Sequence, residues 1–519
     1  MCYVKGYIPR TNIWLERGGG KMKSLLEVEN FGGTDADNDD VLLLAFEDHE
    51  AYKSILGLQR HMIIGKKGSG KTAIYKKIIT TKTSNFFAYG HTFSDYPWHY
   101  HQQQARIGIP DFDKYTHSWK YLILLSTAKI ALNQDQSLPC TDAGMEAMAK
   151  LESFVVDTYG SRDPDLSQIF SPTKRLKLKP YFEVDFRVLK AGISPEAVPI
   201  SELPTIVQEV NAAFQRATLS CLNPQHKYFV AFDQLDLGFD PNSTDYENRL
   251  IGLLLASRDV NLAARERGIQ LFTVVFLRDD IYDRLHFEDK NKMTENFVSL
   301  IEWDTPRTEK TLKALMEKRF GTVLGDVPQR SVPWDEVFNE QREMPRHQTK
   351  YEHMRERTYL RPRDLIKFTN CALARFKERV TAGGSPDDPR KIDNVDVHEA
   401  RVEYSEYLLS EIDDEVHKHM PDYQRHLDVL RALGEWQFER NEFETAYKDQ
   451  YADANLSSAE ALEELYEFSF IGFYRAGGRG FGGSEYMFKY REPHTRFDPT
   501  STRYRIHPGL IEVMGLKRA

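Results

Sequence analysis

One stretch, HMIIGKKGSGKTAIYKK at residues 61–77, indicates the architecture of this chain. A short apolar run leads into three glycines, and a segment with helical spacing follows the lysine and threonine that end the glycine-rich part. Residues 65–72 fit the pattern G-x-x-x-x-G-K-[ST] in full, between an apparent strand and an apparent helix. The stretch therefore predicts a loop that wraps a phosphate group at a helix N-terminus.

Each residue type in this loop has a chemical reason. The glycines let the backbone curl so that its N–H groups point at the β-phosphate. The lysine reaches the β- and γ-phosphate oxygens, and the threonine offers its hydroxyl to Mg²⁺. The predicted nucleotide-binding residues are Gly65, Lys66, Lys67, Gly68, Ser69, Gly70, Lys71 and Thr72.

Five apolar, aromatic-rich runs predict buried strands, with helical stretches between them. The runs lack the polar alternation of a half-exposed strand and end at glycine or charged residues. Strands that alternate with helices predict an α/β fold whose parallel sheet is covered on both faces. The five runs are residues 60–65, 85–90, 227–233, 269–278 and 297–303.

A carboxylate at the end of a buried strand is needed to hold the metal through water. KYFVAFDQLD places Asp233 there, directly after an apolar run. Gln234 follows, where many ATPases carry a glutamate; glutamine orients a water molecule but cannot accept its proton. Asp236 is therefore the candidate base, and a helix N-cap is its alternative role. Without a base, hydrolysis is slow.

Two arginines are candidates for reading the γ-phosphate. Arg278 ends a predicted strand at the carboxyl edge of the sheet, where ligands bind; a salt-bridge cluster with the aspartates that follow it is the alternative. Arg361 and Arg363 flank Pro362 at a helix start, where basic residues oppose the helix dipole unless they meet a phosphate. Of these two arginines, Arg363 is the candidate for contacting the γ-phosphate. Its alternative role is pairing with Asp364 or with acids of the core.

Taken together, these elements resemble the STAND and KAP-type branch of the P-loop ATPases, near the AAA+ and origin-recognition relatives. More narrowly, they are similar to a family of uncharacterised bacterial P-loop ATPases over about residues 28–517, through the strings IIGKKGSGKTAI, FDQLD, FLRDDIYDRLHFEDKNK, LRPRDLIKF and YRIHPGL. The resemblance implies ATP rather than GTP, because no NKxD guanine-reading motif is present. It also implies a nucleotide-driven switch, and some members of the branch act in bacterial defence against phage.

The chain of 519 residues is too long for a single core. We predict a disordered N-terminus at 1–27, with Met22 as an alternative start, and a P-loop ATPase core at 28–330 with a helical insert at about 134–225. A helical lid at 331–410 and a winged-helix-like C-terminal domain at 411–519 follow. The last domain is inferred from helices that precede a two-stranded ribbon, formed by EYMFKYR and TRYRIHP.

Charge and composition limit the possible partners. A net charge of −9 argues against a protein that coats nucleic acid non-specifically, although residues 471–519 carry nine Lys/Arg against four Asp/Glu. The sequence has no run of about 18 apolar residues and no basic-then-apolar leader, which predicts no membrane span and a cytoplasmic location. Four well-separated cysteines without a CxxC pair suit a reducing compartment.

The sequence therefore predicts a P-loop NTPase that binds ATP and Mg²⁺, hydrolyses ATP slowly and acts as a switch. The alternatives are a DNA-binding ATPase that uses its C-terminal domain, and a nucleotide-binding scaffold with little hydrolysis. A protein effector, nucleic acid and a homo-oligomer stay open as partners. The predicted catalytic residues are Lys71, Asp233, Asp236, Arg278 and Arg363, and the predicted metal ligands are Thr72 and Asp233.

Overall fold

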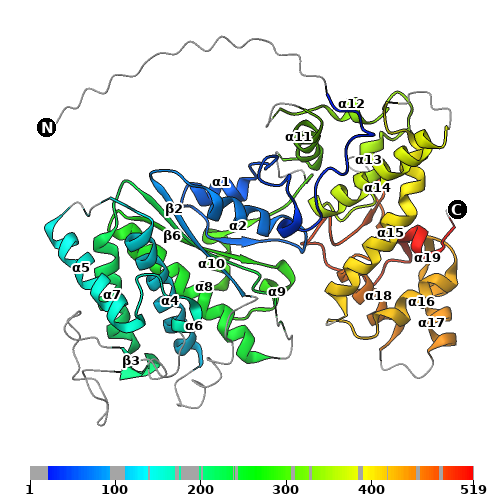
Figure 1. Ribbon diagram of the computed structural model, residues 1–519. Coiled ribbons are helices and arrows are strands. Elements are labelled where there is room, and N and C mark those ends of the chain that lie inside the picture. Colours follow the sequence, from blue (N-terminus) through cyan, green and yellow to red (C-terminus); the bar gives the residue numbers. More distant parts are fainter. Residues whose placement is uncertain are drawn as a thin grey trace.

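The computed structural model places an α/β core beside a second, mainly helical half (Figure 1). The core carries the first part of the chain, and the yellow-to-red half carries the residues that follow it. The structure describes residues 22–93, 111–169, 203–237, 243–305, 310–325, 330–383, 390–451, 456–477 and 483–517, without positions 138, 140 and 418, together with position 239 and the two short strands at 175–176 and 198–199. Among these residues no helix is both long enough and apolar enough to cross a bilayer.

A five-stranded parallel sheet forms the centre of the core, in the order β2-β5-β6-β1-β7. The predicted α/β class and all five predicted strands are confirmed, each within a few residues of its expected ends. Because every strand runs the same way, all five carboxyl ends meet at one edge of the sheet. The strands are β1 (Met62–Ile64), β2 (Phe86–Thr92), β5 (Lys227–Asp233), β6 (Gln270–Leu277) and β7 (Val298–Leu300).

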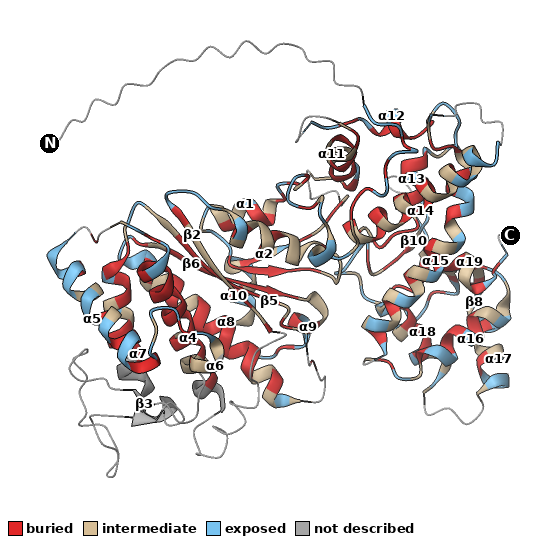
Figure 2. Ribbon diagram, viewed as in Figure 1, coloured by how far each residue is buried: buried red, intermediate tan, exposed pale blue. Residues whose placement is uncertain are grey.

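Helices bury both faces of this sheet, which explains why its strands are apolar throughout (Figure 2). Alternate residues of β5 belong to different cores: Val230 packs with α4 (Asp111–Asn133) and α8 (Thr244–Glu266), whereas Ala231 packs with α1 (Glu50–Leu56) and α2 (Lys71–Thr80). In the described part of the predicted insert the chain is mainly helical. Its helices are α5 (Asp142–Tyr159), α6 (Leu166–Ile169) and α7 (Leu203–Cys221), and its strands are β3 (Arg175–Leu176) and β4 (Val198–Pro199).

Two long helices, α14 (Pro362–Thr381) and α15 (Asn394–Val416), join the core to the C-terminal region. Phe368 stacks on Tyr404 between them at a ring separation of 4.3 Å. Proline at the first position of α14 suits the helix start, because its missing N–H needs no partner there. Shorter helices accompany these two and the sheet: α9 (Asp279–Arg284), α10 (Lys290–Phe297), α11 (Leu312–Leu324), α12 (Trp334–Val337), α13 (Lys350–Arg355) and the 3₁₀ turn η1 (Ala36–Asn38).

The C-terminal region carries its own four-stranded antiparallel sheet, in the order β10-β9-β11-β8. The predicted two-stranded ribbon is therefore wrong in its pairing, because β9 lies between β10 and β11. The sequence run before β9 looked like a continuous helix, but Ser469 adopts a left-handed φ of 61° and turns the chain into a strand. The elements are α16 (Tyr423–Leu433), β8 (Gln437–Glu439), α17 (Arg440–Gln450), α18 (Ser458–Glu467), β9 (Ile471–Arg475), β10 (Glu485–Met487), β11 (Arg503–Ile506), η6 (Pro508–Leu510) and α19 (Ile511–Met514).

Candidate functional site

The glycine-rich loop between β1 and α2 is held in a tight curl. Gly68 and Gly70 have φ values of 76° and 108°, which only glycine adopts without strain. A Cβ at Gly65 would lie 2.6 Å from Ser69 Oγ, so this position also requires glycine. Trp303, which follows β7, donates its indole N–H to the Ser69 carbonyl at 3.0 Å. The loop is therefore a tight curl whose backbone conformation and close packing require its glycines.

Lys71 bends back over the loop that precedes it. Its ammonium donates to the carbonyl oxygens of Gly65 at 2.7 Å and Lys66 at 2.8 Å. Burial lowers the pKa of Lys71, although the carboxylates of Asp236 and Asp279 act in the opposite direction. A half-buried cation at the mouth of a glycine-rich curl, with no carboxylate in direct contact among the described residues, is suited to binding an anion.

Asp233 and Thr72 meet at the carboxyl end of β5. Asp233 is only 2% exposed, and the Thr72 hydroxyl hydrogen-bonds to its side chain. The second carboxylate oxygen, Oδ2, is buried and has no partner within the described structure. Burial raises the pKa of Asp233 to about 6, even though Thr72, the Gln234 N–H and Lys71 each lower it. A buried carboxylate with an unused oxygen beside a hydroxyl fits a hard divalent cation such as Mg²⁺.

A cavity of about 390 Å³ opens over these groups. The loop, the end of β5 and the start of α14 all contribute to its walls. All of the predicted catalytic residues line it: Lys71, Asp233, Asp236, Arg278 and Arg363. Of the eight predicted nucleotide-binding residues, Lys67, Gly68, Gly70, Lys71 and Thr72 line the same cavity.

Arg278 lies at the end of β6 and is already paired. Its guanidinium makes two hydrogen bonds to Asp280, at 3.0 and 2.7 Å, and one to Asp236 at 3.4 Å. Burial lowers the pKa of Arg278, but Asp280 outweighs this effect and holds the pKa above its usual range. The salt-bridge cluster considered from the sequence is thus present, in a position that still faces the cavity. Asp236 is not a helix N-cap, because Ser243 caps α8.

The two arginines at the start of α14 have different surroundings. Arg361 is buried and pairs with Asp364 at 2.9 Å and Glu415 at 2.6 Å. Arg363 donates to Glu411 at 2.6 Å and to the Thr34 carbonyl at 2.9 Å. Its aliphatic stem lies against the loop, since a Cβ at Gly68 would be 3.2 Å from it. Arg363 therefore joins three separate segments at the wall of the cavity.

Gln234 follows Asp233 in an uncommon backbone conformation. Its φ of 58° is left-handed, which costs a non-glycine residue about 1–2 kcal/mol. Gln234 lines the cavity beside Asp236. Strain of this kind persists where the surrounding structure holds a side chain or an N–H in a required direction.

One wall of the cavity had no role in the sequence interpretation. Residues 33–37, together with Asp39 and Leu42, cover the side opposite the sheet edge. Asp39 forms a buried ion pair with Arg319 of α11 at 2.6 Å, and Asp37 pairs with Lys76 of α2 at 2.7 Å. In the sequence, this wall is marked only by the glycine pair and the acidic residues of NFGGTDADNDD. These residues show no helix or strand periodicity from which their place at the cavity could be predicted.

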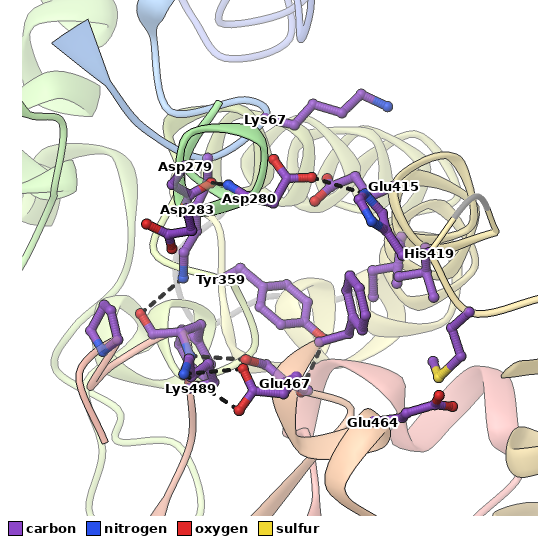
Figure 3. Close-up of a pocket in the computed structure, with 18 of the residues that line it drawn as sticks. Lys67, Asp279, Asp280, Asp283, Tyr359, Glu415, His419, Glu464, Glu467 and Lys489 are labelled. Atoms are coloured by element: carbon purple, nitrogen blue, oxygen red, sulfur yellow. Dashed lines mark hydrogen bonds and ion pairs between the residues drawn. The ribbon is translucent and has the colours of Figure 1, made fainter. Parts of the chain in front are cut away.

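A second cavity, of about 550 Å³, lies on the other side of the loop (Figure 3). It separates α9 and the loop from the end of α15, α18 and the turn after β10. Lys67 lines both cavities. Three of the seven acids that line the second cavity pair with an arginine or a lysine: Asp280 with Arg278 at 2.7 Å, Glu415 with Arg361, and Glu467 with Lys489 at 3.0 Å. Asp280 also contacts His419 at 3.1 Å.

Comparison with known proteins identifies one segment. Residues 310–413 match the family described as the FunZ-associated C-terminal helical domain. This segment runs from the start of α11 to near the end of α15 and includes Arg361 and Arg363. No curated protein matches the chain.

Proposed function

We propose that the chain binds ATP with Mg²⁺ in the cavity over the glycine-rich loop, hydrolyses it slowly, and acts as a nucleotide-dependent switch. One observation carries the proposal. Asp233 Oδ2 is buried and has no hydrogen-bond partner in the described part of the chain, and its carboxylate lies beside Thr72, at the base of a curl whose sequence fits a phosphate-binding loop. A carboxylate buried at this cost needs a cation to offset the lost hydration.

Each residue in the cavity would have a separate task. The loop N–H groups and Lys71 would bind the β- and γ-phosphates. Thr72 and Asp233 would hold Mg²⁺, which supplies neutralisation of charge on the phosphate oxygens. Arg278 and Arg363 would face the γ-phosphate from two sides, from the sheet edge and from α14. Both arginines would have to exchange a carboxylate for a phosphate, a change that makes them responsive to the nucleotide state.

Slow turnover follows from the residues beside Asp233. Gln234 stands where a base is usual and can orient a water molecule but not deprotonate it. Asp236 is the nearest candidate base on the same loop, but Arg278 engages it at 3.4 Å. To accept a proton from water, the Asp236 carboxylate would first have to leave Arg278, which makes it a poorly placed base.

Direct contacts between the loop and the C-terminal region support the switch. Lys66 donates to the Tyr490 carbonyl at 3.2 Å and lies over the Tyr490 ring at 5.8 Å. Lys67 pairs with Asp414 of α15 at 3.1 Å, and Arg361 donates to the Lys67 carbonyl at 3.3 Å. A change in the loop on binding phosphate would be transmitted to these partners without an intermediate.

A second connection runs through charged side chains. Asp236, Arg278 and Asp280 form a continuous chain from the cavity to His419, beyond the end of α15. The His419 ring packs between Phe239 of the core and Phe468 of the C-terminal region, at 5.4 and 5.6 Å. If the γ-phosphate drew Arg278 away from Asp280, the contact with His419 would change. Elements that order around a γ-phosphate behave in this way.

The element order α16-β8-α17-α18-β9 followed by β10 and β11 supports a winged-helix-like domain, and the loop motifs support the resemblance to STAND and KAP-type ATPases.

The alternative of a DNA-reading ATPase is less well supported. α18, the helix that would enter a major groove, carries four glutamates and no Lys or Arg. Three of these glutamates line the second cavity, toward the core. Their charge would repel the DNA backbone.

The test compares wild type with Lys71→Ala. We expect wild type to bind ATP in the presence of Mg²⁺ and to release phosphate slowly, and Lys71→Ala to lose at least about 100-fold in kcat/KM. Equilibrium binding of a fluorescent ATP analogue and single-turnover phosphate release measure the two steps. Thr72→Ser keeps the hydroxyl and serves as the matched control. Equal phosphate release by wild type and Lys71→Ala would contradict hydrolysis, and equal binding would contradict the site.

A further inference from the structure

The outer face of the C-terminal sheet carries an alternating stack of arginines and aromatic rings. Its inner face is apolar and is formed by residues such as Tyr504, Phe473 and Met487. The outer face presents the strand residues that alternate with them. The buried Trp436, just before β8, and one arginine from the loop before α13 adjoin this row. We call this set the arginine–aromatic stack: Arg346, Trp436, Arg505, Tyr486, Tyr474 and Arg503.

The guanidinium groups of the stack lie over ring faces. Arg503 lies 3.9 Å from the centre of the Tyr474 ring. Arg505 lies between two rings, 4.2 Å from Trp436 and 4.7 Å from Tyr486. Such contacts immobilise the planar guanidinium. Arg503 is exposed, whereas Arg505 donates through Nε and Nη2 to the Gln437 amide oxygen at 3.2 Å when that amide is oriented to accept.

Arg346 completes the stack on the far side of Trp436, at 5.1 Å. Arg346 and the neighbouring His347 have left-handed φ values of 71° and 56°. Two successive strained residues show that the surrounding structure holds this loop in position. Arg346 and Arg503 are both exposed, so the stack ends in solvent at each side.

No carboxylate pairs with Arg346, Arg503 or Arg505 in the part of the chain that the structure describes. Of the nearby acids, Glu485 pairs with Arg475 at 3.1 Å. Glu439 accepts from the first turn of α17 as its N-cap. In a chain with a net charge of −9, three fixed arginines without carboxylates form a local site for a polyanion.

We propose that the arginine–aromatic stack binds single-stranded nucleic acid through its phosphodiester backbone. Arg503 and Arg505 are two residues apart on one strand and so project from the same face about 6.6 Å apart, which suits successive phosphates of an extended strand. Tyr474 and Tyr486 lie beside them and are half-buried, so each ring keeps some exposed surface against which a base could stack. An open sheet face accepts an extended strand but does not enter the groove of a duplex.

This inference does not rest on the proposed ATPase. The stack is formed by β8, β9, β10, β11 and the loop before α13, none of which lines the cavity over the glycine-rich loop. Loss of ATP binding in Lys71→Ala should therefore leave nucleic-acid binding intact. A result that contradicts one of the two proposals therefore leaves the other standing.

The experiment uses the full chain and labelled oligonucleotides of about 16 nucleotides, single-stranded and duplex, in fluorescence anisotropy. We expect the single strand to bind at about 50 mM salt and to weaken steeply toward about 200 mM. Arg503→Gln combined with Arg505→Gln should weaken binding by roughly tenfold or more and reduce the slope of log K against log salt by about 1.4. Arg265→Gln, which changes an exposed arginine at the end of α8, is the matched control and should bind as wild type does.

A second pair of variants separates charge from stacking. Arg503→Lys with Arg505→Lys keeps both charges but loses the planar stacking groups. It should retain the salt slope of wild type while binding more weakly. Absence of single-strand binding at low salt, an equal loss in Arg265→Gln, or tighter binding of the duplex or of poly-glutamate than of the single strand would overturn the proposal.

Discussion

The two cavities that meet at Lys67 are both lined by charged side chains, but they satisfy those charges differently. Among the residues that the structure describes, Asp233 in the smaller cavity keeps a buried oxygen without a hydrogen-bond partner, and the Lys71 ammonium donates only to backbone carbonyls. In the larger cavity Asp280, Glu415 and Glu467 each contact a cationic side chain. Size therefore does not identify the ligand site.

The difference lies in what each cavity still requires. Buried charge without a partner is costly, so it persists where a ligand supplies the missing charge. Charge that is already paired stabilises the contact between two parts of a protein and changes only when one partner moves. We therefore interpret the smaller cavity as the ligand site and the larger one as the joint through which the site acts. Four variants test this comparison.

The largest effect is expected at the joint, from Asp280→Asn. Burial raises the pKa of Asp280, but His419 and Arg278 outweigh this and hold the pKa well below its usual range. Removing the charge leaves Arg278 buried without its main partner, which should cost about 3–4 kcal/mol. A group with a depressed pKa stabilises the fold above its unfolded pKa, so the difference from wild type is full at neutral pH.

The difference should shrink as the pH falls below about 4, the ordinary pKa of an aspartate, because Asp280 then loses its advantage relative to the unfolded chain. Urea denaturation of both proteins at several pH values measures it. A matched change at a surface pair, Asp428→Asn beside Arg431, should cost less than about 1 kcal/mol. Equal costs for the two variants would show that the joint is not a buried network.

Asp233→Asn should raise the stability of the unliganded protein, whereas Asp280→Asn lowers stability. The pKa of Asp233 is raised to about 6, so in the unliganded protein its contribution to stability is present below the unfolded pKa and is lost as the pH rises through 6. Asparagine avoids that loss and should stabilise the unliganded protein by about 2–3 kcal/mol at pH 8, while removing the response to Mg²⁺. Thermal melting with and without Mg²⁺ and ATP checks both. A lower melting temperature for unliganded Asp233→Asn would contradict the ligand-site interpretation.

Gln234→Glu sharpens the interpretation of the smaller cavity. A glutamate at this position could accept a proton from water, as Gln234 cannot, so under the proposed function phosphate release should rise by about tenfold. Gln234→Ala, which can neither orient nor deprotonate water, should lower the rate below that of wild type. Single-turnover release separates this effect from nucleotide exchange. A slower Gln234→Glu variant would mean that Asp236 or another group is already the base.

The smallest effect is expected from Lys67→Ala. Its nearer partner, Asp414, is 65% exposed on its side chain, and exposed ion pairs contribute little. Its second partner, Glu411, is less exposed but lies 3.8 Å away. Stability should fall by about 0.5 kcal/mol or less, and the difference should vanish at high salt. Denaturation at low and high salt measures this. A larger loss would show that the joint depends on Lys67 as well as on Asp280 and His419.

Much of the core could be predicted because its signals are local. The five strands are short apolar runs, and the phosphate loop is a fixed pattern of eight residues. Asp233 could be placed because a carboxylate directly after a buried strand must lie at the carboxyl edge of a parallel sheet.

The partners of the arginines could not be predicted in the same way. Glu411 and Glu415, which engage Arg363 and Arg361, lie about fifty residues further along the chain and meet them only when α15 packs on α14. Residues 33–37 form a wall of the cavity without any periodic pattern. The position of β9 depends on the left-handed turn at Ser469, a residue type that seldom adopts this conformation. Long-range packing, not local preference, determines these features.

The order of the C-terminal sheet has a consequence for synthesis of the chain. β8 emerges early but occupies the edge beside β11, the last strand to be made. Until β11 leaves the ribosome, β8 has no neighbour, and the sheet that precedes α19 exposes unpaired edges. The turn that carries Tyr490, the partner of Lys66, is completed in the same interval. A nascent chain can thus fold its parallel-sheet core well before that core gains its contacts with the C-terminal sheet.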